Sequence, residues 1–216
     1  MPLGDELERE LLECLGDKFL EALAQVPYVA YDSAHKICAE HFRGPEAENV
    51  RPWVRRGMVE TLIQDSAQQF PAIETTVVRA DKSAWNHTEV RSGRVILTAS
   101  TVQSPCGPVE FSEYRAGFAL AAAQLPGMED DRPANAPMYV LLLHSPQSQL
   151  PMAPEDRGLL PGSIYLAWPA ADLSGYVHKI NLVERHFEII RRNHLPREWT
   201  DEASVSYLRS SRAIAI

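Results

Sequence analysis

The sequence predicts an α+β protein in which N-terminal helices pack on a mainly antiparallel sheet containing a β-meander, followed by a late C-terminal helix. Three observations predict this class: a helical apolar repeat over residues 1–70, two-residue alternation over 71–180, and a return to helical spacing over 181–216. With 216 residues, 45% hydrophobic and 23% charged, the composition is that of a globular protein. We expect a single domain over 1–216, divided into a helical part, a sheet part with two long loops, and a helix with a tail.

Three amphipathic helices are expected in the N-terminal part. The first carries large apolar residues at four-residue spacing and is expected to end before Pro27. A second, short helix is expected from Ser33, which can cap its N-terminus. The third is expected to begin near Pro52, since proline is tolerated at the first helical position, and to end at Pro71.

The sheet is predicted from four stretches. Thr75–Arg79 is β-branched, and Thr88–Val102 alternates around a Ser-Gly pair typical of a two-residue hairpin. With Val109–Phe118, the hairpin is expected to form three neighbouring antiparallel strands, a β-meander. Tyr139–Leu143 and Ile164–Trp168 are near-continuous apolar runs, which are typical of central strands covered on both faces.

The later part of the chain predicts a capped helix and long connections. Asn181, with Glu184 three residues on, predicts the start of the late helix. Stretches 126–137 and 145–161 are rich in Pro, Gly and polar residues and predict loops or lids, whose role the sequence does not define. The apolar residues Ala213–Ile216 are expected to dock on the body or on a partner.

Charge and cysteine content narrow the class of protein. The formal net charge of −8 and pI of about 5.4 disfavour nucleic acid as a partner, although a local basic patch would still allow nucleic-acid binding. No apolar run spans a bilayer and the acidic N-terminus lacks a signal pattern, so we expect a soluble, cytoplasmic protein with no membrane association. Three widely spaced cysteines, Cys14, Cys38 and Cys106, predict neither a disulfide framework nor a zinc site.

A candidate catalytic group lies on the expected strand Val109–Arg115. Strict alternation would place Glu113 and Arg115 at the end of a core-facing row, which is costly unless they pair, reach water or bind something. Nucleases of the restriction-endonuclease type hold a metal with a Glu-x-Lys-like pair on a strand beside a hairpin, usually with an Asp from a neighbouring strand, here Asp81. The favoured interpretation is instead a solvated salt bridge on a strand that twists out of the core.

Candidate ligand-binding residues follow the two apolar strands. His144 comes directly after one strand and Asp172 follows the other, and strand ends are common places for binding sites. In the alternative interpretation, His144 starts a turn and Asp172 caps one.

The sequence contains no phosphate-binding loop, GxSxG, HExxH or calcium-loop motif. We therefore expect a non-catalytic binding or regulatory protein that acts through protein–protein contacts or self-association, without a cofactor or metal. One alternative is a metal-dependent phosphodiesterase or nuclease-like enzyme of a toxin or defence module, which uses Asp81, Glu113 and Arg115 with a divalent metal. A second alternative is a small-ligand sensor with a pocket near His144 and Asp172. Whether the chain is an enzyme is left open.

Overall fold

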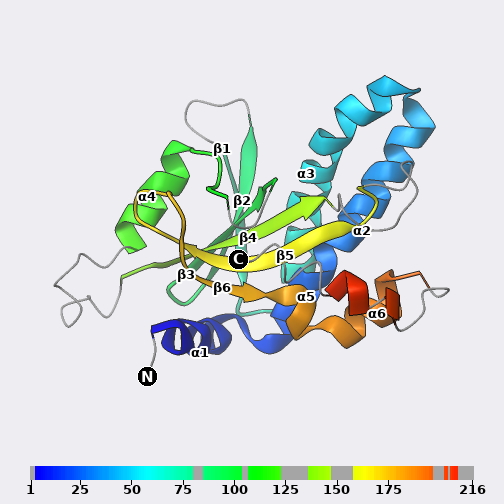
Figure 1. Cartoon of the computed structure of the whole chain (residues 1–216). Helices are drawn as coiled ribbons and strands as arrows, with labels where there is room; N and C mark the ends of the chain where they lie inside the picture. Colours follow the sequence, from blue (N-terminus) through cyan, green and yellow to red (C-terminus); the bar gives the residue numbers. More distant parts are fainter. Residues whose placement is uncertain are drawn as a thin grey trace.

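The structure is a computed structural model (Figure 1). It describes residues 3–79, 85–103, 107–122, 136–146, 158–196, 202–203 and 205–208. The expectations for Asp81, Cys106, most of the loops 126–137 and 145–161, and the tail 213–216 lie outside the described residues.

A six-stranded sheet with the strands in sequence order forms the centre of the fold (Figure 1). Its strands are β1 (Glu74–Arg79), β2 (Asn86–Ser92), β3 (Val95–Thr101), β4 (Met138–Pro146), β5 (Pro161–Pro169) and β6 (Tyr176–Asn181). Neighbouring strands are antiparallel except β3 and β4, which are parallel. The expected mainly antiparallel sheet is therefore confirmed. The two apolar runs form β4 and β5, which lie inside the sheet and are buried along almost their whole length.

The β-meander is present but consists of β1, β2 and β3. Its predicted third strand, Val109–Phe118, is wrong, because Glu113–Ala122 forms helix α4. The segment is rich in alanine, a strong helix former, and Ser112 stands directly before it with its carbonyl accepting from the amide of Ala116. Helix α4 lies in the crossover that joins the parallel strands β3 and β4, which a tight hairpin cannot connect.

The helices before the sheet are α1 (Leu3–Leu15), α2 (Asp17–His41) and α3 (Pro45–Ala67). The predicted boundary at Pro27 is wrong: the chain breaks at Gly16, whose φ of 74° suits glycine, and then continues as one helix through Pro27 and Ser33. Pro52 is inside α3 rather than at its start. A proline removes one hydrogen bond from a helix, and the packing of α2 against α3 outweighs that loss.

The late helix begins as predicted. The side-chain oxygen of Asn181 accepts from the backbone amides of Val183 at 3.0 Å and Glu184 at 3.2 Å. The helix is divided into α5 (Leu182–Arg185) and α6 (Phe187–His194). Within the described ranges, no helix combines the length and the apolar character needed to cross a bilayer.

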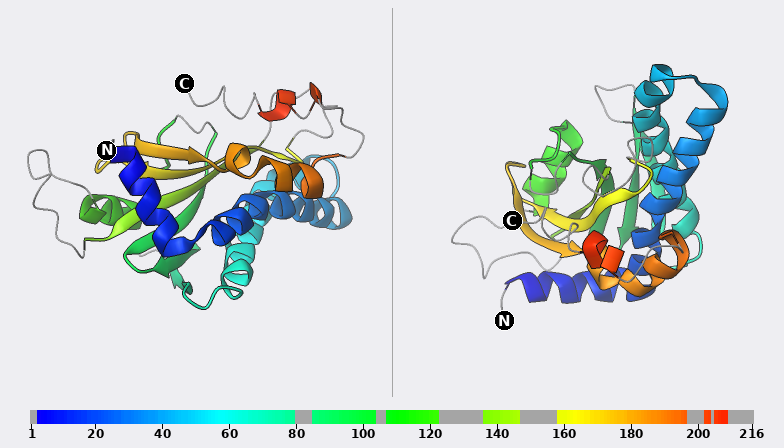
Figure 2. Two further views of the ribbon diagram at one scale, coloured as in Figure 1. Left: turned by 90° about the horizontal axis from the view of Figure 1, so that it is seen from below. Right: turned by 45° about the vertical axis from the view of Figure 1, so that its right-hand side comes forward.

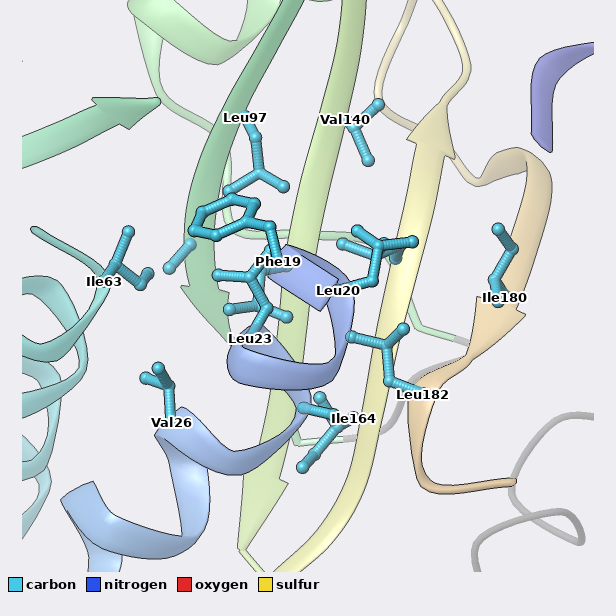
Figure 3. Packing of buried hydrophobic residues seen from close by; sticks show 14 of the residues in the cluster. Phe19, Leu20, Leu23, Val26, Ile63, Leu97, Val140, Ile164, Ile180 and Leu182 are labelled. Atoms are coloured by element: carbon cyan, nitrogen blue, oxygen red, sulfur yellow. The ribbon is translucent and has the colours of Figure 1, made fainter. Parts of the chain in front are cut away.

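The sheet buries both faces. Helices α1, α2, α3, α5 and α6 pack on one face, and Phe19, Leu20 and Leu23 of α2 lie over Leu97 and Val140 of the strands (Figure 3). The other face packs against α4, which lies across the sheet from α1 (Figure 2). Full burial of each such side chain contributes roughly 1.5–3 kcal/mol. The two layers hold the strand ends in place, and the candidate site lies at one of these ends.

Candidate functional site

A pocket of about 540 Å³ lies between α3 and the loop that precedes α4. We call it the α3–α4 pocket. The end of β1, the start of β2 and the ends of β3 and β4 also line it, so it is at the carboxyl end of the parallel pair. Ligand sites commonly form at such ends, because the sheet is rigid and the loops leave its edge accessible.

Strand β2 carries a row of charged and polar side chains toward the α4 face. Nε2 of His87 lies 3.3 Å from a carboxylate oxygen of Glu89, and the other carboxylate oxygen accepts from Arg91 at 2.7 Å. His87 and Glu89 are only 2% and 6% exposed. The carboxylate is therefore buried between two partners, which is the arrangement that makes its burial tolerable.

The ring of His87 is fixed in one orientation. It stacks on Tyr114 with ring centroids 3.8 Å apart and planes 8° apart. Since the Glu89 carboxylate is an acceptor, the Nε2 that faces it carries the hydrogen, and Nδ1 of the neutral ring then has a free lone pair. Burial lowers the pKa of His87 and outweighs the opposing effect of Glu89, so the ring is neutral at neutral pH. Its Nδ1 is buried and makes no hydrogen bond within the described part of the protein.

Arg115 holds the loop before α4 against the end of β3. Its guanidinium donates to the carbonyl of Glu110 at 2.9 Å and to that of Ala99 at 3.4 Å. Its Nε is buried and has no hydrogen-bond partner among the described residues. The charge of Arg115 lowers the pKa of His87, which places the two groups within electrostatic reach of each other.

The α3 side of the pocket adds a carboxylate. Glu60 accepts from the backbone amide of Thr88 at 2.7 Å. Burial nevertheless raises the pKa of Glu60, although that hydrogen bond and the nearby guanidinium of Arg56 lower it.

Three exposed aromatic side chains among the lining residues, Trp53, Trp85 and Phe111, form what we call the aromatic rim. Trp53 and Trp85 stack with centroids 4.9 Å apart, and their exposed fractions are 54% and 47%. Phe111 is 69% exposed. Exposed aromatic groups beside a polar pocket are typical of binding sites, because they offer apolar area at low entropic cost.

The structure places His144 in the wall of this pocket, at the end of β4. Its Nδ1 lies 3.1 Å from the Tyr31 hydroxyl and its Nε2 lies 3.4 Å from the Thr101 hydroxyl. Burial, and then the charge of Arg55, lowers the pKa of His144 to about 3. Arg55 lies 3.9 Å from the centre of the Tyr31 ring and donates to the carbonyl of Gly158. His144 is thus a neutral, hydrogen-bonded group in the wall.

Asp172 lies elsewhere. It is in the exposed turn after β5, and its carboxylate accepts from the backbone amide and the hydroxyl of Ser174, which lowers its pKa. His144 pairs with Ile164 near the start of β5, so His144 and Asp172 are at opposite ends of the strand. The two predicted ligand residues do not come together, and Asp172 caps a turn, as the alternative interpretation expected.

Glu113 and Arg115 both line the pocket, but not as a pair on one face of a strand. Residues two apart on a helix point about 200° apart, so the expected geometry is wrong for these two side chains. Within the described ranges, which do not include Asp81, no three His, Cys, Asp or Glu side chains are grouped to hold a metal ion. A Glu-x-Arg pair on a strand does exist beside the hairpin, as Glu89 and Arg91.

Sequence reasoning missed His87, Glu89 and Arg91. The available signal was the two-residue alternation of these polar side chains in a strand whose other face carries Val90 into the core and Thr88 against α3. Chemically, the pocket offers a buried acceptor or base at His87, a buried donor at Arg115, and apolar rings at its rim.

Comparison with protein-family models, curated proteins and solved structures finds no significant match for this chain.

Proposed function

We propose that this protein binds a small molecule in the α3–α4 pocket and acts as a small-ligand sensor. One observation carries the proposal: His87 and Arg115 line the same 540 Å³ pocket, and each has a buried polar atom, Nδ1 of His87 and Nε of Arg115, that makes no hydrogen bond in the described part of the protein. Leaving such a group unpaired costs about 1–3 kcal/mol. A ligand that pairs both atoms recovers that cost on binding.

The rigidity of the polar groups supports the proposal. His87 is held by the carboxylate of Glu89 and the ring of Tyr114, and Arg115 is held by two backbone carbonyls. A ligand would therefore not have to order these side chains itself, and ordering costs about 0.5–1.5 kcal/mol per side chain. The pocket volume is also within the range of about 300–1,000 Å³ that small-molecule sites occupy.

The test is a screen of fragment-sized compounds by ligand-observed NMR, with a thermal-shift series on each compound that binds. Saturating ligand at about 100 times its Kd stabilises the folded state by roughly 2.7 kcal/mol, which is measurable. We expect compounds whose binding is weakened by Trp53→Ala at the rim. Phe42→Ala is the matched control, since Phe42 is an exposed aromatic residue outside the pocket lining. A screen without hits, or hits insensitive to Trp53→Ala, contradicts the proposal.

Action through protein–protein contacts stays a second candidate, and the exposed aromatic rim favours it. A protein partner that uses the rim would bury Trp53, Trp85 and Phe111, and aromatic residues often dominate such interfaces. Sedimentation of the purified chain tests self-association, and co-purification with and without Trp53→Ala tests other partners. A partner or dimer lost in Trp53→Ala but not in Phe42→Ala would favour this second function.

A further inference from the structure

We infer that the ligand of the α3–α4 pocket carries a nucleobase, whose hydrogen-bonding edge pairs with His87 and Arg115 while its ring contacts the aromatic rim. This inference rests on the proposed ligand-binding function and specifies the chemical class of the ligand.

The first argument is the pairing of acceptor and donor. Nδ1 of His87 accepts a hydrogen bond and Nε of Arg115 donates one, and the two residues, in the wall of the same pocket, are only 2% and 8% exposed. A carboxylate ligand offers only acceptors, which leaves His87 unpaired. An ammonium ligand offers only donors and is repelled by Arg115. Nucleobases carry a donor beside an acceptor on one edge, such as the N6 amino group and N7 of adenine.

The second argument is the apolar part of the site. The aromatic rim presents the stacked rings of Trp53 and Trp85 and the exposed ring of Phe111 next to the polar wall. Every nucleobase has a flat face that stacks favourably on an aromatic side chain. A flat ring with a polar edge would therefore use both parts of the pocket, whereas an aliphatic chain would use only the aromatic rim.

The third argument separates a monomer from a nucleic acid strand. The chain has a formal net charge of −8, and the lining of the pocket contains four glutamates against three arginines. Both features oppose a polyanion, whose binding depends on neutralised phosphates. The site therefore fits a free base or nucleoside better than a strand.

The experiment is a titration of the full chain with adenosine, guanosine, cytidine and uridine, followed by tryptophan fluorescence and melting temperature. We expect at least one nucleoside to bind saturably, to change the fluorescence and to raise the melting temperature. The same nucleoside with its hydrogen-bonding edge methylated should bind at least about tenfold more weakly, because the edge no longer pairs with the site.

Two variants locate the binding. His87→Phe removes the acceptor and keeps a ring that can stack on Tyr114, so binding should be lost. If this core variant does not fold, Trp53→Ala at the exposed rim serves instead and should weaken binding, while Phe42→Ala should not.

The outcomes separate the two proposals. Fragment hits in the pocket without any nucleoside binding overturn the nucleobase inference and leave the proposed function standing. Absence of both overturns both. A single-stranded oligonucleotide that binds more tightly than every nucleoside, or a methylated nucleoside that binds as tightly as its parent, also overturns the inference.

Discussion

Acid should destabilise this protein through His144. The pKa of this buried histidine is lowered from 6.5 to about 3 by desolvation and by the charge of Arg55. Between these two values the unfolded chain binds more protons at this residue than the folded chain, so stability falls as the pH falls below about 6.5 and continues to fall toward about 3. Integration from pH 7 to pH 4 gives a loss of about 3 kcal/mol from this residue alone.

Urea denaturation of the wild type and His144→Asn at pH 7 and pH 4, followed by circular dichroism, measures this contribution. The comparison is needed because other groups titrate as well: burial lowers the pKa of His87, His186 and His194 and raises that of Glu60. At pH 7, His144→Asn should be less stable by roughly 1–3 kcal/mol, since buried hydrogen bonds are lost.

At pH 4 that difference in the free energy of unfolding should shift by about 3 kcal/mol in favour of the variant, because an asparagine side chain has no ionisable proton to release on folding. The exposed His41 provides the control, and His41→Gln should follow the wild-type profile. The reasoning is refuted if the profiles of the wild type and His144→Asn run parallel between pH 7 and pH 4.

Three further predictions follow. Tyr207→Phe should lower the free energy of unfolding in urea by about 1–2 kcal/mol, because the buried Tyr207 hydroxyl hydrogen-bonds to Tyr28 and to the carbonyl of Pro161; an unchanged value would contradict this. Asp172→Ala should leave ligand binding unchanged, since the residue caps a turn away from the pocket, and a titration with any fragment hit checks it. Addition of Mg²⁺, Mn²⁺ or Zn²⁺ should not raise the melting temperature. A rise that EDTA reverses and that is absent in Glu113→Ala would instead favour the phosphodiesterase alternative.

The layout of the fold could be predicted in part because the long N-terminal helices bury one face and the central strands are continuous apolar runs. The apolar runs of β4 and β5 and the cap at Asn181 identified their elements correctly. The strand prediction for Val109–Phe118 was wrong because it relied on the two-residue alternation of Val109, Phe111, Glu113 and Arg115, and the last two of these residues belong to helix α4. The serine before this helix and its alanines carried the correct signal.

The pocket could not be predicted as a unit, because its wall combines side chains from six separate parts of the sequence. These are α3, β1, β2, β3, α4 and β4, represented by Glu60, Val78, His87, Thr101, Tyr114 and His144. No local motif links positions that only the sheet order brings together. His144 was identified because it ends an apolar strand, whereas Glu113 lines the pocket for a reason other than the predicted one.

A crystal structure of the protein with the first stabilising compound tests the central claim most directly. The account predicts the compound in the α3–α4 pocket, with a donor within about 3.2 Å of Nδ1 of His87 and an acceptor at a similar distance from Nε of Arg115. A compound bound elsewhere on the protein, with both atoms still unpaired, would contradict it.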